Sequence, residues 1–388
     1  MLRFTHLAEQ ILQKLDDEGL AKSREVEQFW QKYVDERDYS WLRIVNIPTI
    51  LAHGDTYLHL AAGHGQIDEF EMLIKENSNA DPINDVGETP FLIACIEGRR
   101  NIVARLLQNS EELKIDLNLR DICGFTPFSN AAMRGHSEVA KMIMDNSLQL
   151  KIDLNIKDSE HGLTAFHYAC MAVGHSKVAE MMINNSSKLG IDLTSLDNDD
   201  NSAFHLACYY GNIDIIAMIL KNSSMLKIDW NGKNIGGYTG FQLICDKGHS
   251  RRIAEIIINY SECLKIDLNS KTSTNGMTAF HLACMGGDSD ISQFNCTRIV
   301  DMMMEQSECY KIDLTTKDEL GRNGYQIAEF YKNIKVMNLI ETKLPSLVVY
   351  SYLSNSRGGW NKQGGVAKVP ELINEEEGIL YHCGFLEH

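Results

Sequence analysis

Four histidines recur at one position of a pattern that repeats along the chain, and histidine is a common side chain in acid–base catalysis and metal binding. A catalytic site would need one of them beside a nucleophile and an orienting acid. Repetition argues against this, because each copy has the same surroundings and therefore the same structural task. A metal site is not favoured either, because the histidines lie at least one repeat apart rather than on one helix face. We expect a structural role for these residues, which are His59, His167, His205 and His281.

Five of the ten cysteines also recur in register. Buried cysteine behaves as a small apolar residue, and other copies of the pattern have alanine at this position. The five would lie one repeat apart, roughly 10 Å on the scale of a helix diameter, which exceeds the reach of a disulfide bond. The chain has no C-x-x-C pair and therefore no zinc-site spacing. We expect buried, reduced thiols, which fit an intracellular location, at Cys95, Cys170, Cys208, Cys245 and Cys284.

Both sets belong to one stretch, Gly162 to Cys170 (GLTAFHYAC), which has relatives along most of the chain. The step from Thr56 to the next anchor, Thr89, is 33 residues, and the steps that follow are 37 to 39 residues. The last step, from Thr278 to Asn323, is 45 residues. A period in this range indicates stacked supersecondary units rather than one globular core.

Each recurring position has a physical role. Glycine two residues before the anchor suits a turn with positive φ, and Asp200, which replaces it in one copy, tolerates that conformation better than most residues. The anchor itself, Thr or Ser, is a helix N-cap, and Pro90 and Pro127 follow it where a missing N–H is harmless. The second helix has apolar residues at helical spacing, such as Val139 and Ile143, which predict a core stripe.

The T-x-[LF]-H-x-A-[AC] signature, in phase with the glycine or aspartate ahead of it, resembles the ankyrin repeat. About eight copies cover residues 50–343. The resemblance implies an all-α ankyrin-repeat solenoid, in which helix–turn–helix units with hairpin-like loops are stacked. It further implies that the recurring histidines hydrogen-bond within and between adjacent units. In such stacks the hairpin tips and the ends of the first helices line a concave face that binds other proteins.

Residues outside the repeats are expected to form the ends of this stack. Residues 1–49 have apolar residues at helical spacing, which predict a helical N-terminal cap; a partner-binding or dimerising helix pair is the alternative. Residues 344–388 are predicted to form a C-terminal cap segment and a flexible tail. Segments such as 110–118 predict a longer helix end, then an extended strand-like entry and a lengthened loop. A further stretch at 286–297 is expected to bulge from the stack.

Composition restricts the kind of partner. The chain has 388 residues and a formal net charge of −16, which argues against nucleic-acid binding because phosphates require a basic surface. It has no 18-residue apolar stretch, and its start lacks the apolar run of a signal peptide. We therefore predict a monomeric cytoplasmic protein, a nuclear location being left open, that binds another protein rather than nucleic acid or membrane and needs no cofactor or metal.

Positions that vary between copies on the expected concave face are the candidate contacts. Aromatic residues, methionine and arginine are enriched in interface cores. We predict a non-enzymatic interaction scaffold or adaptor; the alternatives are an ankyrin-type inhibitor that masks a basic partner, or the targeting region of a larger enzyme or channel. A purely structural reading is that these side chains fill gaps between loops. The predicted contact residues are Phe125, Met133, Arg134, Leu163, Met171, Tyr209, Tyr210, Tyr238 and Met277, with Asp246 and Lys247 beside them.

Overall fold

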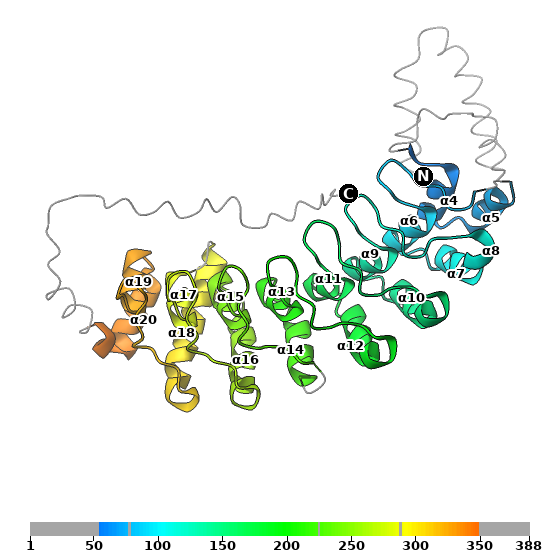
Figure 1. Ribbon diagram of the computed structural model, residues 1–388. Helices are drawn as coiled ribbons and strands as arrows, with labels where there is room; N and C mark the ends of the chain where they lie inside the picture. Colours follow the sequence, from blue (N-terminus) through cyan, green and yellow to red (C-terminus); the bar gives the residue numbers. More distant parts are fainter. Residues whose placement is uncertain (1–53, 77–78, 224–225, 287–288, 349–388) are drawn as a thin grey trace, which may run out of the picture.

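The computed structural model describes residues 54–76, 79–223, 226–286 and 289–348. These residues form consecutive helix pairs that stack into a curved array, with the first helices along the inner side of the arc and the second helices along its outer side (Figure 1). Between the pairs run extended loops, which we call fingers. Among the described residues the one β pairing is an isolated bridge. The prediction of an all-α repeat solenoid is confirmed.

The described helices alternate between inner and outer positions. The inner helices are α4 (Tyr57–His64), α6 (Pro90–Ile96), α9 (Pro127–Met133), α11 (Ala165–Met171), α13 (Ala203–Tyr209), α15 (Gly240–Lys247), α17 (Ala279–Met285) and α19 (Gly324–Phe330). The outer helices are α5 (Ile67–Glu76), α7 (Arg100–Gln108) with the short α8 (Ser110–Leu113), α10 (Ser137–Leu150), α12 (Lys177–Leu189), α14 (Ile213–Lys221), α16 (Arg251–Leu264), α18 (Asp290–Tyr310) and α20 (Ile334–Lys343).

Reciprocal caps begin most of the inner helices. In α11 the backbone N–H of Thr164 donates to Nδ1 of His167 at 3.0 Å, and the N–H of His167 donates back to the Thr164 hydroxyl at 3.5 Å. This capping box satisfies two N–H groups that the first helical turn leaves without partners. In α15 a glutamine replaces the histidine, and Oε1 of Gln242 accepts from the N–H of Thr239 at 2.9 Å. The recurring Thr is therefore the N-cap that the sequence predicted, and the recurring His, for which a structural role was expected, completes the capping box.

The fingers are held by one short polar side chain each. In the finger before α11, the carboxylate of Asp158 accepts from the N–H groups of Glu160, His161 and Leu163 at 2.9, 2.6 and 2.7 Å. Each finger also contains a turn residue with positive φ, which is glycine in most copies. In the finger before α13 this residue is Asp200, with a φ of 58°. The substitution at this position is tolerated because aspartate visits the left-handed region more readily than most residues.

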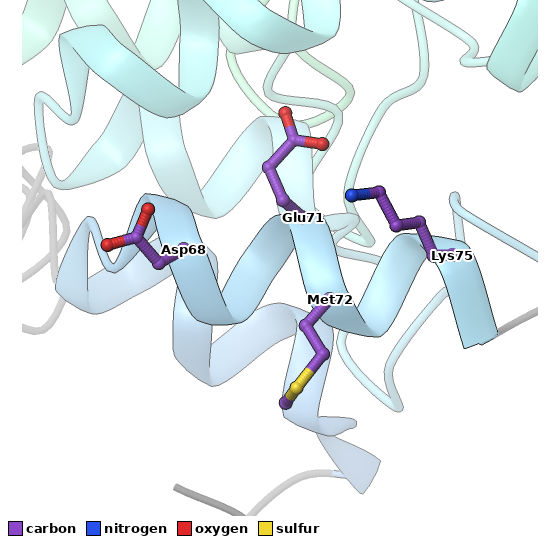
Figure 2. Close-up of a pocket in the computed structure, with 4 residues that line it drawn as sticks. All are labelled: Asp68, Glu71, Met72 and Lys75. Atoms are coloured by element: carbon purple, nitrogen blue, oxygen red, sulfur yellow. The ribbon is translucent and has the colours of Figure 1, made fainter. Parts of the chain in front are cut away.

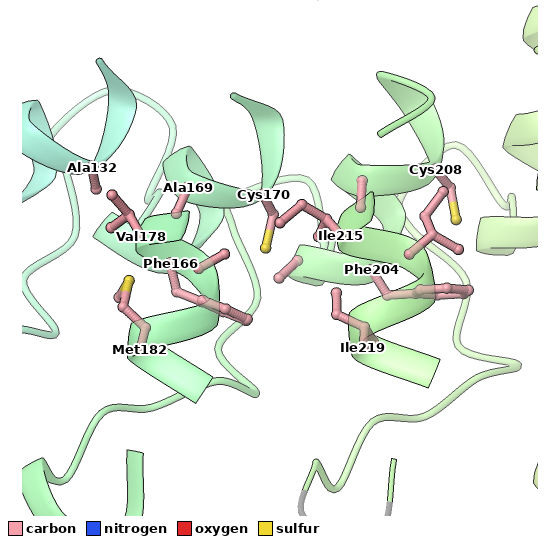
Figure 3. Packing of buried hydrophobic residues seen from close by; sticks show 14 of the residues in the cluster. Ala132, Phe166, Ala169, Cys170, Val178, Met182, Phe204, Cys208, Ile215 and Ile219 are labelled. Carbon is pink, nitrogen blue, oxygen red and sulfur yellow. The ribbon is translucent and has the colours of Figure 1, made fainter. Parts of the chain in front are cut away.

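One apolar core runs through the described array. In the six copies from α6 to α17 a phenylalanine of the inner helix packs against apolar residues of the outer helix, as Figure 3 shows for Phe166 with Val178 and Met182, and for Phe204 with Ile215. All five side chains are fully buried. Leu58 in α4 and Tyr325 in α19 take the position of the phenylalanine in the first and last described copies. Burying one such side chain contributes about 1.5–3 kcal/mol. The alanine–cysteine pair beside the phenylalanine is small enough to let the helices of neighbouring copies approach closely.

Asparagine side chains join successive fingers along one edge of the stack. Nδ2 of Asn155 donates to the carbonyl of Gly190 at 2.8 Å, and its Oδ1 accepts from the N–H of Asp192 at 2.8 Å. The same two bonds recur at three further asparagines, Asn118, Asn231 and Asn269. Each amide therefore bridges two repeats at the segment that follows the outer helix.

The added length of each repeat lies mainly in the outer helix rather than in a longer loop. The helices α10, α12 and α16 run through the recurring Ser-x-x-Leu segment and end at a residue with positive φ, such as Lys151 and Lys265 at 55° and 56°. The predicted longer helix end is therefore present, and the lengthened loop is corrected to a helical extension. Residues 1–53 and 349–388 lie outside the described residues, as do the predicted N-terminal cap and the flexible tail.

The stretch expected to bulge near 286–297 is mostly helical. Ser289 caps α18 by accepting from the N–H of Ser292 at 3.1 Å, and the helix then continues without a break to Tyr310. Cys296 is fully buried and Asn295 donates to the carbonyl of Gly248 at 3.1 Å. The insertion therefore lengthens α18 at its N-terminal end and packs against the preceding repeat.

Candidate partner-binding surface

The predicted contact residues of the third and fourth repeats come together in one small apolar group. We call it the Phe125 cluster; it consists of Phe125, Met133, Leu163, Tyr168, Met171 and Leu206 and is separate from the main core. The rings of Phe125 and Tyr168 lie 5.2 Å apart at 49°. The hydroxyl of Tyr168 donates to Asp158 Oδ2 at 3.0 Å, so the ring is tied to the finger that carries Leu163.

The Phe125 cluster lies where the fingers meet the inner helices. Phe125 and Leu163 directly follow the glycine of their fingers, whereas Met133 and Met171 end α9 and α11. Phe125, Met133 and Met171 are partly buried around the enclosed members of the group. The inner face of the arc thus exposes parts of large apolar side chains whose other parts are fixed by packing, which suits a binding surface that is formed before the partner arrives.

The next inner helix presents an aromatic pair. Tyr209 and Tyr210, both half-buried, lie with their ring centroids 5.2 Å apart at 72°. Nζ of Lys247, from α15, lies 5.2 Å from the Tyr209 ring centroid and 3.4 Å from the carboxylate of Asp246. Four of the residues named from the sequence therefore form one group of rings and charges, which we call the Tyr209 group.

Three further predicted residues differ in their exposure. Arg134 is exposed at the end of α9. Tyr238 is half-buried against the main core, and burial raises the pKa of its hydroxyl. Met277, predicted to be exposed, is 2% exposed and belongs to the main core.

Leu163 is the second residue whose predicted exposure is wrong, because it is 0% exposed. Both Leu163 and Met277 close the turn of their finger through backbone bonds. The N–H of Asp158 donates to the Leu163 carbonyl at 2.9 Å, and the N–H of Thr272 donates to the Met277 carbonyl at 2.7 Å. These two side chains lie beneath the surface, so they support the neighbouring contact residues rather than form contacts themselves.

A second exposed apolar region was missed by the sequence analysis. We call it the C-terminal patch; it contains Ile291 and Phe294 of α18 with Phe330, Tyr331 and Ile334 around the turn between α19 and α20. Phe330 and Tyr331 form a ring pair 5.1 Å apart at 75°, much like the Tyr209 and Tyr210 rings. A sequence signal was present, because each pair begins seven residues after its helix N-cap.

The recurring histidines are buried structural groups. In α13 the N–H of Ser202 donates to Nδ1 of His205 at 3.2 Å, so the ring proton lies on Nε2, which is 3.0 Å from the Gly232 carbonyl. His59 and His281 make the corresponding contacts to Glu88 and Arg322 carbonyls at 3.0 and 3.1 Å. Burial lowers the pKa of all three rings.

His167 is the most enclosed of the four. Its Nε2 faces the Ser195 backbone but lies outside normal hydrogen-bonding geometry, and burial lowers its pKa to about 4. Its Nδ1 contacts the hydroxyl of its own N-cap, Thr164, at 3.0 Å, and that hydroxyl also accepts from the N–H of His167 within the helix cap. Both side chains are buried, so the pair is enclosed in the fold rather than open to a substrate. The histidine therefore has the same capping role as its counterparts.

Among the described residues, no group of three or more His, Cys, Asp or Glu side chains is arranged to hold a metal ion. No described helix is long and apolar enough to cross a membrane. A shallow hollow lies on α5, lined by Asp68, Glu71, Met72 and Lys75 (Figure 2). All four side chains come from one helix, and Glu71 is paired with Arg105 of α7. The hollow is an open helix face on the outer side of the stack.

Comparison with known proteins agrees with this fold. The family model described as "Ankyrin repeats (3 copies)" matches residues 42–121, 111–195 and 148–229. Among solved structures 563 chains match, including the crystal structure of the human ASB11 ankyrin repeat domain, at 18% sequence identity and a TM-score of 0.50. That match covers 63% of this chain and 98% of the other chain. No curated protein matches the sequence.

The stacked helix pairs with capped inner helices define an all-α repeat solenoid. The family match identifies ankyrin repeats within residues 42–229, and the described residues have the fold of an ankyrin-repeat stack. Ankyrin repeats are generally protein–protein interaction modules, and the family is generally non-enzymatic. The count of about eight repeats stays a prediction, although the described residues contain eight successive helix pairs.

Proposed function

We propose that the chain is a scaffold or adaptor that binds another protein through the inner face of the stack, with the Phe125 cluster and the Tyr209 group as the main contacts. The observation that carries this proposal is the convergence of residues from three successive inner helices on one half-buried apolar strip. Half-buried aromatic side chains on a rigid support provide large contact areas at a low cost in conformational entropy.

The charge along the fingers bears on the alternative of an inhibitor that masks a basic partner. The chain has a net charge of −16, but exposed lysines recur at one position of the fingers. Their ammonium groups hydrogen-bond to a backbone carbonyl of the next finger. Nζ of Lys157 donates to the carbonyl of Leu196 at 2.6 Å, and Nζ of Lys233 donates to that of Lys271 at 2.6 Å. These cations lie among the carboxylates of the described fingers, which supports the apolar contact over charge masking.

The test uses the partner that the full-length chain captures from a lysate of its source cells. We expect the double substitution Tyr209→Ala and Tyr210→Ala to weaken binding of that partner by at least about tenfold, or 1.4 kcal/mol. Thermal stability should be nearly unchanged, because both rings are half-exposed. The matched control is Tyr260→Ala with Tyr310→Ala, two half-buried tyrosines on the outer helices α16 and α18.

Two outcomes would contradict the proposal. Unchanged binding with a lower melting temperature would show that the rings of Tyr209 and Tyr210 serve the fold instead. An equal loss of binding in the outer-helix control would show that the contact lies elsewhere on the stack. Steep weakening of binding between low and high salt would instead favour the charge-masking inhibitor.

A further inference from the structure

The C-terminal patch is unusual in its exposure. Ile291 is 75% exposed, Phe330 60% and Ile334 66%. Single exposed apolar residues are normal on protein surfaces, but a group of them marks a contact site. The patch lies in the last two described repeats, beyond the Tyr209 group, so its occupant is a separate question from the proposed function.

The start of α18 and the turn between α19 and α20, which carry the residues of the patch, both lie beside Gly286. A Cβ placed on Gly286, at the end of α17, would lie 2.8 Å from Nδ2 of Asn333 and 3.3 Å from Cγ of Gln293. Asn333 immediately precedes Ile334, and Gln293 immediately precedes Phe294. The start of α18 and the turn between α19 and α20 are therefore adjacent, and their exposed apolar residues flank one region of the surface.

Cationic side chains lie beside the exposed rings, together with two exposed carboxylates, Asp290 and Glu329, which adjoin the patch. Cζ of Arg298 lies 5.7 Å from the Phe294 ring centroid, and Cζ of Arg322 lies 5.2 Å from that of Phe330. Arg322 is already paired with Asp318 at 2.8 Å, so it adds little net charge. The turn from Phe330 to Lys335 contains two exposed lysines and no carboxylate. An apolar segment with neighbouring acidic residues would match this arrangement.

We propose that the occupant is residues 371–385 of this same chain. That segment has three successive glutamates, Glu375 to Glu377, followed closely by Ile379, Leu380 and Tyr381. The acidic run would face the lysines of the α19–α20 turn, and the apolar residues would cover the rings. The contact would be intramolecular, with residues 371–385 on an apolar face of the last described repeats.

The point of attachment favours this occupant over a second molecule. Leu347 is 2% exposed, and its carbonyl accepts from Nδ2 of Asn323 at 3.1 Å, which fixes the chain on the last repeat. Glu371 follows Val348 by 23 residues, a length of chain that can span on the order of 25 Å. Such tethering gives an effective concentration in the millimolar range, well above that of another copy at micromolar concentration.

The experiment is zero-length carbodiimide cross-linking of the full-length protein, with peptides identified by mass spectrometry. The expected products join Lys332 or Lys335 to a glutamate of the 375–377 run, within one chain. Changing both lysines to glutamate should lower the yield of these products at least about tenfold. In a further variant, Glu375, Glu376 and Glu377 are also changed to lysine. Cross-links should then return, with the carboxylates now at positions 332 and 335 and the amines at positions 375–377. Lys221→Glu with Lys227→Glu, two exposed lysines elsewhere, is the matched control.

The source of each cross-link is read from a mixture of ¹⁴N- and ¹⁵N-labelled chains. Products of a single isotope support the intramolecular contact, whereas mixed-isotope products would show that a second copy covers the patch and would overturn the proposal. Absence of both kinds of product would also overturn it. As an independent measure, Leu380→Asp with Tyr381→Asp should speed hydrogen exchange of the α19–α20 turn, and an unchanged rate would contradict the apolar contact.

Discussion

At the scale of single residues, the capping histidine is a titratable side chain whose protonation the fold does not need. The capping position is histidine in several copies and glutamine in α15, where Nε2 of Gln242 donates to the Ser270 carbonyl at 2.6 Å. Glutamine thus makes the same two contacts as a neutral histidine, one to the N-cap and one to the next finger. The protein itself shows that protonation is not required at this position.

The first prediction concerns the change His167→Gln. Because the pKa of His167 falls from 6.5 to about 4 on folding, only the unfolded chain binds the proton between these values. The free energy of unfolding therefore decreases as the pH falls from 6.5 to 4, by on the order of 3 kcal/mol for this one group. The variant should lose less stability over that range than the wild type, as measured by urea unfolding at several pH values.

The difference between the variant and the wild type reports on His167 alone, because the carboxylates that titrate in the same pH range are present in both proteins. The same change at His175, which is exposed, controls for the altered composition. At neutral pH the His167→Gln variant should be within about 1 kcal/mol of the wild type, because the capping bond is retained. If the free energy of unfolding of the variant depends on pH as strongly as that of the wild type, the buried ring of His167 does not contribute to that dependence.

A second prediction follows from the position of the thiols. Burial raises the pKa of Cys95, Cys170 and Cys208, and a buried thiol is a poor nucleophile. Alkylation of the native protein should therefore modify Cys123, Cys263 and Cys309, which are exposed, before any buried cysteine. Peptide mapping after a short exposure to iodoacetamide measures this, and unfolding in urea should make all the sites equally reactive.

At the scale of elements, the asparagine bridges test what joins neighbouring repeats. Asn155→Thr removes two bonds to the next repeat, and the natural chain already has threonine at the equivalent Thr194, whose hydroxyl contacts Asp192 at 2.8 Å. Net contributions of about 0.5–1.5 kcal/mol for each hydrogen bond predict a loss of about 1 kcal/mol at this exposed edge. Urea unfolding measures it, and Asn184→Thr on the exposed face of α12 is the control. Equal losses in the two variants would show that the bridge adds nothing.

The elements that could be predicted from the sequence are those fixed by local chemistry. An N-cap such as Thr164, a turn residue such as Asp200 and a small residue beside a phenylalanine each depend on a few neighbours, so their pattern is sufficient. The insertion was predicted as a bulge because it adds residues between the two helices of its repeat. Ser289, which accepts from the N–H of Ser292, and the burial of Cys296 produce a helix there instead.

The candidate surface was only partly predictable, for a reason that applies to fingers in general. Phe125 and Leu163 occupy the same position after a finger glycine, yet Phe125 is half-exposed and Leu163 is buried. Their difference arises from Tyr168 and Leu206, which belong to later elements and enclose Leu163. Exposure of a finger residue depends on the neighbouring repeat, whereas the repeat pattern describes each copy alone.

At the scale of the whole molecule, the main helix–helix contacts of the described array join helices of the same repeat or of neighbouring repeats. The helix α14 packs against α13 and α16, whereas α20 packs against α18 and α19. Stability should then be a sum of local terms and of interfaces between neighbours, with the ends opening more readily than the middle. This differs from a globular domain, where one core substitution weakens every part together.

A matched pair of substitutions tests this view of the molecule. Ile219 in α14 and Ile340 in α20 lie at the same position of their helices, and both are 0% exposed. Replacing either with alanine should cost about 2–5 kcal/mol locally. Ile340→Ala should speed hydrogen exchange in α18–α20 alone, because among the described helices α20 has a neighbouring repeat on one side. Ile219→Ala should speed exchange in the repeats on both sides and lower the urea midpoint more. Faster exchange in α4–α7 caused by Ile340→Ala would mean that the stack unfolds as a single unit, and stability would then not divide between neighbouring repeats.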